Sequence, residues 1–489
     1  MTRAEHLGTE RSTAMSDQPK PMNLAVVGAG PGGYAAAFLA ADLGMQVTLV
    51  DAEANPGGVC LYYGCIPSKA LLHVAEVLNE ARHAANWGVE FSEPKVDLAK
   101  LRAWGQGVVR KLTGGLGQLS KQRAVKYMQG RASLVDSRTL RIQEIAGGEE
   151  QFSFDNIILA TGSRPATLSL IPSQSPRVLD STAALQLNHI PKTMLVVGGG
   201  YIGLELGSVY AALGSQVSVV EMMDGLLPGV DRDLVTPLAK RMATICKSIM
   251  LSTKVAAVKE EKDGLRVKFE GAEAPAEEQV FETVLVSVGR KPNSNIPGLE
   301  NTKVEVDSRG FIKVDLQRRT HEPAIFAIGD VAGEPMLAHK ASHEGRVAVE
   351  VIAGHKVAFE PQAIPAVVFT DPEIAWCGLT ETQAQSENIP IKVSRFPWGA
   401  SGRATTLDRS DGVTKLILDP ETERVLGVGI AGPGAGELIA EGVLAIEMSA
   451  TASDLKLTIH PHPTLSETLM ESAEVFFGQS THLYRPKKN

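Results

Sequence analysis

The sequence predicts an α/β protein in which two βαβ units precede a C-terminal α+β segment. Its 489 residues correspond to about three domains at about 150 residues each. Short apolar runs, typical of buried parallel strands, enter glycine-rich turns at residues 23–33 and again at residues 194–203. Apolar residues make up 44% of the chain and charged residues 21%, which is typical of a globular protein and excludes a disordered or collagen-like one.

The composition also excludes several kinds of partner. The chain has 48 Lys and Arg against 56 Asp and Glu, a formal charge of −8, whereas nucleic acids and anionic membranes attract clustered basic residues. No apolar run reaches the roughly 20 residues that a bilayer span requires. We therefore expect an enzyme with no nucleic-acid or membrane partner.

The N-terminal segment and the cysteine content bear on the compartment. Residues 1–21 are polar, lack the apolar core of a signal peptide and contain acids that transit peptides avoid. We interpret them as a flexible tail and expect a cytoplasmic protein. Four cysteines are too few for a secreted disulfide scaffold, and in a reducing compartment a close cysteine pair favours catalysis over structure.

Residues 23–51 form the first βαβ unit. The apolar run 23–27 enters Gly28, Gly30 and Gly33, which have the GxGxxG spacing, and a helical stretch and a second strand ending in Asp51 follow. The first glycine permits the tight turn, the second lets the backbone approach a pyrophosphate, and the third packs helix on strand. The pyrophosphate then lies at a helix N-terminus, where free N–H groups favour negative charge.

The same pattern recurs in residues 194–221. Gly198, Gly200 and Gly203 repeat the spacing, and the strand 217–220 ends in Glu221. An acid at this place accepts hydrogen bonds from an adenosine ribose and repels a 2′-phosphate. Because no basic residue lies in 219–224, we expect this site to prefer NAD to NADP. Either turn alone is compatible with an ordinary αβ connection, but two copies, each followed by an acid, favour two Rossmann-like dinucleotide-binding domains.

A cysteine pair directly follows the first unit. Cys60 and Cys65 are separated by four residues, and Cys65 opens a predicted helix with Pro67 in its first turn. The positive potential of a helix N-terminus favours a thiolate, and a reducible disulfide suits electron transfer. Two unpaired buried thiols, or a zinc site without a second ligand pair, are the alternatives. We interpret Cys246 and Cys377 as core residues.

The C-terminal part has no nucleotide fingerprint of its own. Strand-like runs lie at 366–370, 414–418 and 425–430, and a long helix is expected from Glu437. This alternation predicts an α+β domain.

In combination, these features resemble the flavin-dependent pyridine nucleotide-disulfide oxidoreductases, from about residue 23 to about residue 480. Further matching motifs lie at 158–163, 288–290, 325–330, 336–339 and 460–467. The resemblance implies FAD at the first fingerprint and NAD at the second. It divides the chain into a tail (1–21), an FAD-binding domain in two parts (22–165 and 289–361), an NAD-binding domain (166–288), a dimerisation domain (362–480) and a C-terminal tail (481–489).

The resemblance also implies roles for single residues. Asp330 is similar to the acid that holds the flavin's ribityl chain. Lys69 is similar to a lysine beside the flavin ring that pairs with a glutamate, here Glu205, and its charge would stabilise the anionic reduced flavin. Further FAD contacts are implied for Ala132, Thr161, Gly162, Ser163, Met336, Leu337, Ala338 and His339, and further NAD contacts for Glu205, Val255 and Gly289.

His462 and Glu467 resemble the family's acid–base pair. Thiol–disulfide exchange needs a base, imidazole titrates near neutral pH, and a carboxylate on its far nitrogen would fix the tautomer. Alternatively, Thr464 to Glu467 has the pattern of a capping box, so that Glu467 would only cap the following helix. His462 is preferred to His460 because it stands five residues before Glu467, as in the family. The family's pair acts on the partner subunit's disulfide, which implies a homodimer.

The activity implied is the FAD-dependent oxidation of protein-bound dihydrolipoamide to lipoamide, with reduction of NAD, through a Cys60–Cys65 disulfide. The implied partner is the lipoyl-domain-bearing acyltransferase of a 2-oxoacid dehydrogenase complex, or the lipoyl carrier of glycine cleavage. Another NAD-linked flavin disulfide reductase of the family is the alternative, and a non-catalytic scaffold is a different class. Tyr62, Tyr63 and Pro461 depart from the family pattern and leave fine specificity open.

Overall fold

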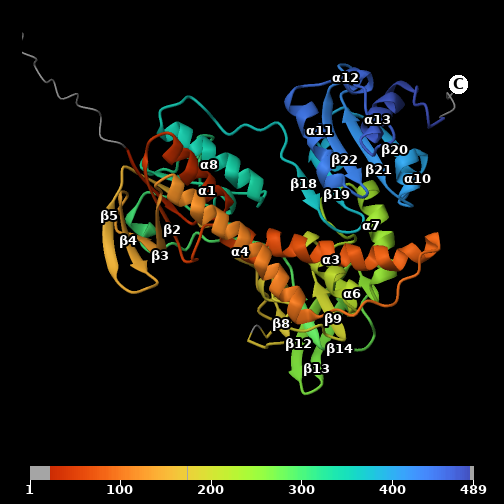
Figure 1. The fold of residues 1–489 in the computed structure, drawn as a ribbon, viewed down its shortest axis with the longest axis horizontal. Helices are drawn as coiled ribbons and strands as arrows, with labels where there is room; N and C mark the ends of the chain where they lie inside the picture. Colours follow the sequence, from red (N-terminus) through yellow and green to blue (C-terminus); the bar gives the residue numbers. More distant parts are fainter. Residues whose placement is uncertain (1–21, 173, 485–489) are drawn as a thin grey trace, which may run out of the picture.

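The computed structural model describes residues 22–172 and 174–484. The chain forms two α/β units and a C-terminal α+β unit (Figure 1), which confirms the predicted fold class. The predicted N-terminal tail and residues 485–489 lie outside the described residues. No helix in the part of the chain described is both long enough and apolar enough to cross a bilayer.

The first unit is built on a seven-stranded sheet with strand order β17-β6-β1-β2-β3-β4-β5. Its first two strands and β6 are parallel, and Val27 lies opposite both Val50 and Leu159. The C-terminal ends of the three strands therefore lie side by side, and Gly28, Asp51 and Ala160 lie together at this end of the sheet. The strands are β1 (Asn23–Val27), β2 (Gln46–Asp51), β3 (Lys126–Leu134), β4 (Thr139–Glu144), β5 (Glu149–Ser153), β6 (Asn156–Leu159) and β17 (Ile325–Ala327).

Helix α1 (Pro31–Asp42) lies against α8 (Ala338–Ile352), although about 300 residues separate them in sequence. A Cβ atom on Gly345 would lie 2.6 Å from Gly32 O, so the two helices approach at glycine. Strand β17 and helix α8 therefore return to the first unit after the chain has built the second.

The second unit is built on a five-stranded parallel sheet, β11-β10-β9-β15-β8. A three-stranded antiparallel sheet, β12-β13-β14, lies between β11 and β15 in sequence, and the pair β7–β16 connects the second unit to the first. The strands are β7 (Ser163–Pro165), β8 (Val178–Leu179), β9 (Thr193–Val197), β10 (Gln216–Val220), β11 (Ser248–Met250), β12 (Thr253–Glu261), β13 (Gly264–Gly271), β14 (Gln279–Phe281), β15 (Thr283–Val286) and β16 (Arg290–Pro292). The helices are α5 (Ser181–Leu185), α6 (Tyr201–Ala212) and α7 (Arg232–Ile245).

The C-terminal unit is an antiparallel sheet, β18-β19-β22-β21-β20, with helices packed on it. The three predicted strand runs are confirmed, and the predicted long helix begins at Ala435. The strands are β18 (Ala366–Val368), β19 (Ile374–Gly378), β20 (Lys392–Pro397), β21 (Val413–Leu418) and β22 (Val425–Ala431), and the helices are α9 (Glu381–Glu387), α10 (Gly402–Thr406), α11 (Ala435–Glu447), α12 (Ala452–Leu457) and α13 (Glu467–Phe477).

Between the units run α2 (Gly58–Tyr63), α3 (Cys65–His83) and α4 (Leu98–Gln122), and Figure 1 shows α3 passing below the C-terminal unit in blue and above α6. One apolar core joins these parts, because Leu71 of α3, Leu204 of α6, Leu234 of α7 and Ile374 of β19 pack in a single cluster. Cys246 and Cys377 are buried in cores, as expected. The domain limits at residues 165, 288 and 361 stay a prediction.

Candidate active site

A cleft of ≈ 310 Å³ lies where the first unit, the second unit and α3 meet. It collects most of the residues expected to bind FAD together with the cysteine pair. Among its lining residues are Gly28, Gly30, Gly33, Asp51, Cys60, Cys65, Lys69, Thr161, Gly162, Ser163, Glu205, Asp330, Met336 and Ala338.

The first glycine turn has the shape that a dinucleotide requires. Gly28 has φ +100°, and a Cβ atom there would lie 2.3 Å from Ala160 O, while a Cβ on Gly33 would lie 1.8 Å from Gly28 O. Asp51 accepts hydrogen bonds from Ala29 N at 2.6 Å and Glu53 N at 3.0 Å. Its carboxylate thus lies directly beside the turn.

The second turn repeats this geometry outside the cleft. Glu221 accepts from Gly199 N at 2.6 Å and from Met223 N at 2.8 Å. Apart from the glycine itself and its two chain neighbours, no heavy atom of the described chain lies within 4 Å of a Cβ built on Gly200 or Gly289, or on Gly162 in the cleft. Open backbone at these places, combined with an acid at the edge, fits a dinucleotide at each turn.

The cysteine pair lies at the start of α3. Sγ of Cys60, in α2, is 2.6 Å from Sγ of Cys65, the first residue of α3. The pKa of Cys65 is lowered to about 7, because its sulfur accepts a hydrogen bond from Cys60 and lies near Lys69, and these effects outweigh burial. The pKa of Cys60 is raised by its hydrogen bond to Cys65 and by burial. Cys65 is therefore the sulfur that more readily carries the negative charge.

Lys69, one turn further along α3, pairs with Glu205 of α6, with Nζ 2.8 Å from Oε2. The other carboxylate oxygen of Glu205, which is buried, accepts from Phe369 N at 3.0 Å. The Phe369 ring lies 4.3 Å from the ammonium. All three units thus contribute to fixing one cation beside the sulfurs. Sequence reasoning missed Phe369, which no motif marks.

Asp330 lies in the turn η3 (Gly329–Val331) after β17. It accepts from Ser163 Oγ at 2.5 Å, and Arg290 Nε donates to the same hydroxyl at 2.7 Å. Glu344, fully buried on α8, accepts from Gly329 N at 2.6 Å and holds the turn. Arg290 belongs to the 288–290 motif, but its partner was not predicted, and Glu344 was not marked at all, because their partners are distant in sequence.

The proposed acid–base pair is present in the C-terminal unit. His462 Nδ1 lies 2.9 Å from Glu467 Oε1, while Glu467 Oε2 accepts from Thr464 N at 2.7 Å. Glu467 thus contacts the histidine. The capping box is not formed, because the N-cap residue of α13 is Ser466 without a side-chain cap bond, and only the bond from Thr464 N belongs to that pattern. Burial raises the pKa of Glu467, but the bonds from Thr464 N and His462 outweigh burial and lower that pKa.

The two histidines of the loop differ in exposure and in partners. The side chain of His460 is only 5% exposed, with Nδ1 3.0 Å from Thr458 O and Nε2 2.8 Å from Glu441 Oε1. The side chain of His462 is 72% exposed, and within residues 22–172 and 174–484 its Nε2 makes no hydrogen bond. His462 therefore has a nitrogen free for a substrate proton. It does not line the cleft of its own chain.

Val255, Ala132, His339 and Leu337, also expected at the site, do not line the cleft. Val255 is buried in the core of the second unit with Val220, and Ala132 is partly buried on β3. His339 Nε2 lies 2.8 Å from Pro365 O. Leu337 is the N-cap residue of α8.

Tyr62 and Tyr63, which depart from the family pattern, donate hydrogen bonds to the loop after β2. Tyr63 donates to Glu53 Oε1 at 2.6 Å, and Tyr62 donates to Asn55 O at 3.1 Å. The bond to Glu53, with burial, raises the pKa of Tyr63 to about 12. Both phenols therefore tie α2 to the first unit.

A dinucleotide turn, a cysteine pair and an ion pair in one cleft, together with a second dinucleotide turn outside it, define a disulfide oxidoreductase that uses two dinucleotides. The sequence profile of the pyridine nucleotide-disulphide oxidoreductases matches residues 22–345, and that of their dimerisation domain matches residues 364–473. The chain belongs to this family, whose members contain FAD and are linked to NAD(P).

Named relatives cover nearly the whole chain. Dihydrolipoyl dehydrogenases of Vibrio parahaemolyticus and Haemophilus influenzae are each 50% identical over 462 residues, which is 94% of this chain and 97% and 96% of theirs. Among solved structures, LpdA from Mycobacterium tuberculosis superposes with a TM-score of 0.85 at 27% identity, over 93% of this chain and 99% of that one.

Proposed function

We propose that the chain is an NAD-linked dihydrolipoyl dehydrogenase that works as a homodimer. The observation that carries the proposal is the cysteine pair of α2 and α3, which lies beside the Lys69–Glu205 ion pair in a cleft that contains the first dinucleotide turn. The activity of the named relatives supports dihydrolipoamide as substrate. Glu221 supports NAD rather than NADP, because its carboxylate repels a 2′-phosphate.

Substrate oxidation is a thiol–disulfide exchange. One thiol of dihydrolipoamide attacks Sγ of Cys60, the Cys60–Cys65 bond breaks, and Cys65 leaves as a thiolate. The second thiol then attacks the mixed disulfide, lipoamide departs with its new S–S bond, and Cys60 is released. The substrate loses two electrons and the cysteine pair gains them.

Protons and charge are handled by the side chains around the sulfurs. His462 of the partner subunit takes the proton of the first attacking thiol at Nε2 and gives it to Cys60 when that sulfur is released. It then holds the proton of the second thiol, while Glu467 of the partner subunit holds Nδ1. Lys69 stabilises the Cys65 thiolate, in line with the lowered pKa of that thiol. FAD held at the first turn would supply the acceptor for the electron pair of the cysteines, which returns them to the disulfide, and NAD at the second turn would supply the final acceptor.

The residues expected to hold FAD are those around the first turn, with Asp51 near its ribose and Asp330 near its ribityl chain. NAD would lie along Gly198 to Gly203 and Glu221. The match to the dimerisation domain and the exposure of His462 support an active site completed by the partner. We propose a cytoplasmic enzyme that serves the lipoyl domains of a 2-oxoacid dehydrogenase complex or of glycine cleavage.

An anaerobic titration of the purified flavoprotein tests the proposal. Dihydrolipoamide should reduce the protein and produce a long-wavelength absorption from the Cys65 thiolate beside the flavin, and Cys65→Ser should lack that absorption. NADH should reduce it far more readily than NADPH. Reduction by glutathione but not by dihydrolipoamide would instead identify another disulfide reductase of the family.

A further inference from the structure

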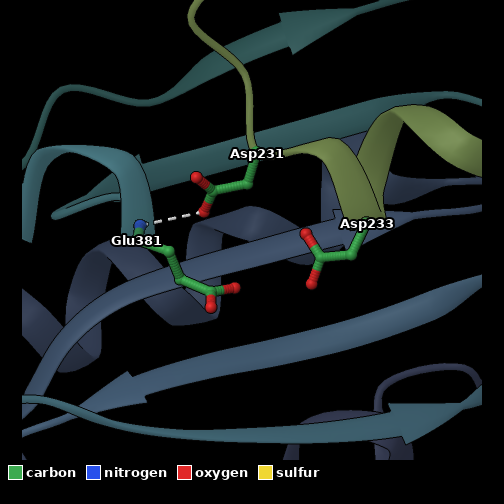
Figure 2. A group of neighbouring side chains, drawn as sticks. All are labelled: Asp231, Asp233 and Glu381. Atoms are coloured by element: carbon green, nitrogen blue, oxygen red, sulfur yellow. Dashed lines mark hydrogen bonds between the residues drawn. The ribbon is translucent and has the colours of Figure 1, made fainter. Parts of the chain in front are cut away.

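A fully buried lysine joins the second unit to the C-terminal unit. Lys415 of β21 is 1% exposed, and its Nζ lies 2.7 Å from Asp231 Oδ2, 2.7 Å from Asp233 Oδ1 and 2.9 Å from Glu381 Oε1. Figure 2 shows these three carboxyl groups facing a common space. Their oxygens lie within 4.8 Å of one another, the spacing of a cation site, and the Lys415 ammonium occupies that place.

The acids come from different parts of the fold. Asp231 and Asp233 lie at the start of α7 in the second unit, and Glu381 begins α9 in the C-terminal unit. Asp231 also accepts from Glu381 N at 3.0 Å and Thr382 N at 3.3 Å, so it caps a helix of the other unit. Figure 2 shows the first of these bonds as a dashed line. Arg395 of β20 adds a second cation, with Nε 2.6 Å from Asp233 Oδ2.

Apolar packing beside the cluster is equally close. A Cβ atom built on Gly429 of β22 would lie 2.6 Å from Leu234 Cδ1 of α7. Leu238 and Met242 hold the rest of α7 in the core of the second unit. Helix α7 therefore belongs to the core of the second unit, and the sheet of the C-terminal unit packs against it.

The opposite face of β21 contacts the helix of the acid–base pair. Successive residues of a strand point to opposite faces, and Thr414 Oγ1, next to Lys415, lies 2.7 Å from Thr468 Oγ1 of α13. Thr468 directly follows Glu467. One strand thus contacts the carboxylate cluster on one side and the helix that begins with Glu467 on the other.

We infer that Lys415 is a positioning residue for the reaction. Its ammonium binds the carboxylates of both α7 and α9 and so fixes the C-terminal sheet against α7. The position of this sheet in turn determines the positions of His462 and Glu467 relative to the partner's sulfurs. This inference rests on the proposed function. Lys415 contacts no substrate and acts only through the elements that it joins.

The variant Lys415→Ala tests the positioning role of Lys415, with two activities measured on the same flavoprotein. NADH oxidation by lipoamide needs the cysteines and His462, whereas NADH oxidation by ferricyanide needs only flavin and nicotinamide. We expect lipoamide turnover to fall by about tenfold to a hundredfold while the ferricyanide activity stays within about twofold, since small displacements of catalytic groups have effects of this size. An unchanged ratio of the two activities would overturn the inference.

Cation rescue provides a readout other than turnover. In Lys415→Ala the three carboxylates lose the cation that they share, while Arg395 still pairs with Asp233 and Glu381. Added Mn²⁺ should therefore bind in place of the ammonium, as followed by its electron paramagnetic resonance signal, and should restore part of the lipoamide activity. Mn²⁺ that binds without moving the activity ratio would contradict a positioning role. Lys254→Ala, which removes an exposed ion pair with Glu270, is the matched control and should change neither activity.

If Lys415→Ala yields no flavoprotein, the variant Glu381→Gln tests the positioning role instead. This variant keeps the lysine and two of its three carboxylates. Its lipoamide turnover should fall less than in Lys415→Ala, while its ferricyanide activity should again stay nearly unchanged. Equal loss of both activities would overturn the inference. Wild-type protein that does not use lipoamide at all would refute the proposed function instead, and the two failures are thereby distinguished.

Discussion

At the scale of single residues, the reactivity of the site depends on the charge of Cys65. Its pKa of about 7 results first from the hydrogen bond of Cys60 and then from Lys69, against the effect of burial. In the two-electron-reduced protein, the thiolate absorption should therefore grow as the pH rises through about 7. Lys69→Met removes the cation and should move that midpoint upward by about one pH unit.

Absorbance of the reduced protein against pH measures this effect. Lys456→Met, which removes a lysine bonded to Gln479 far from the cysteines in sequence, serves as the control and should leave the midpoint in place. A midpoint that does not move in Lys69→Met would show that the ion pair with Glu205 does not act on Cys65.

The two histidines of the C-terminal loop permit a matched comparison. His462→Gln removes the base and should lower lipoamide turnover by about 10²–10⁴-fold. His460→Gln loses a buried contact with Glu441 and should lower thermal stability while turnover changes little. Steady-state rates and melting curves of both variants separate the roles; a larger catalytic loss in His460→Gln would reverse the assignment.

Residue-level prediction from sequence succeeded where a motif marks the residue. Cys65 does begin a helix, and Asp51 and Glu221 do lie beside their glycine turns. Phe369, which is 164 residues from its partner Glu205, and Glu344, which acts through a backbone N–H, could not be predicted because only the tertiary fold brings them to the site.

At the scale of elements, the second glycine turn contains one glycine that the fold requires and another that only the bound dinucleotide would require. A Cβ on Gly203 would lie 2.4 Å from Gly198 O, whereas one on Gly200 meets nothing within 4 Å in the described structure. Gly203→Ala should thus destabilise the protein by about 1–3 kcal/mol. Gly200→Ala should fold with nearly normal stability but raise the KM for NAD by about tenfold, or about 1.4 kcal/mol.

Thermal unfolding and NAD kinetics of the two variants check this contrast. If Gly200→Ala left the KM for NAD unchanged, the second turn would not be the place where the pyrophosphate approaches.

The buried ion cluster should also be visible in the acid stability of the protein. Burial raises the pKa of Asp231 and of Asp233. Lys415 outweighs burial and lowers both pKa values, together with the N–H groups of Glu381 and Thr382 at Asp231 and with Arg395 at Asp233. A lowered pKa in the folded state stabilises the protein above the unfolded pKa of about 3.9 and loses this effect as the pH falls through the folded pKa. Lys415→Met should lower the free energy of unfolding by about 3–5 kcal/mol at neutral pH.

Denaturant unfolding of both proteins from pH 7 down to about pH 3 measures this effect. The difference between wild type and Lys415→Met should narrow below about pH 4, where the aspartates of the unfolded chain become protonated. A difference independent of pH would mean that the lysine acts by packing alone.

Strand and helix order could largely be predicted, because periodicity and glycine turns are local signals. The helix that begins at Cys65 was predicted, but α4 and the antiparallel β12–β14 sheet were not. The contacts of α7 with the C-terminal sheet were not predicted either, since charged residues at a helix start look the same whether they face water or another unit.

At the scale of the whole molecule, the exposure of His462 and its place outside the cleft of its own chain favour an active site shared between two subunits. Exposed apolar side chains surround the same loop, with Ile459 95% exposed and Leu457 also exposed. The site proposed here is thus complete only when a second chain supplies His462 and Glu467.

Mixed dimers test this central claim most directly. Cys60→Ser and His462→Gln chains, each inactive alone, are co-expressed with different tags, and dimers containing one of each are isolated. If the histidine acts on the partner's sulfurs, each mixed dimer has one intact site out of two and should show about half of the wild-type lipoamide turnover. If the histidine acts on its own chain, both sites are broken, and the absence of turnover in the mixed dimers would contradict the account.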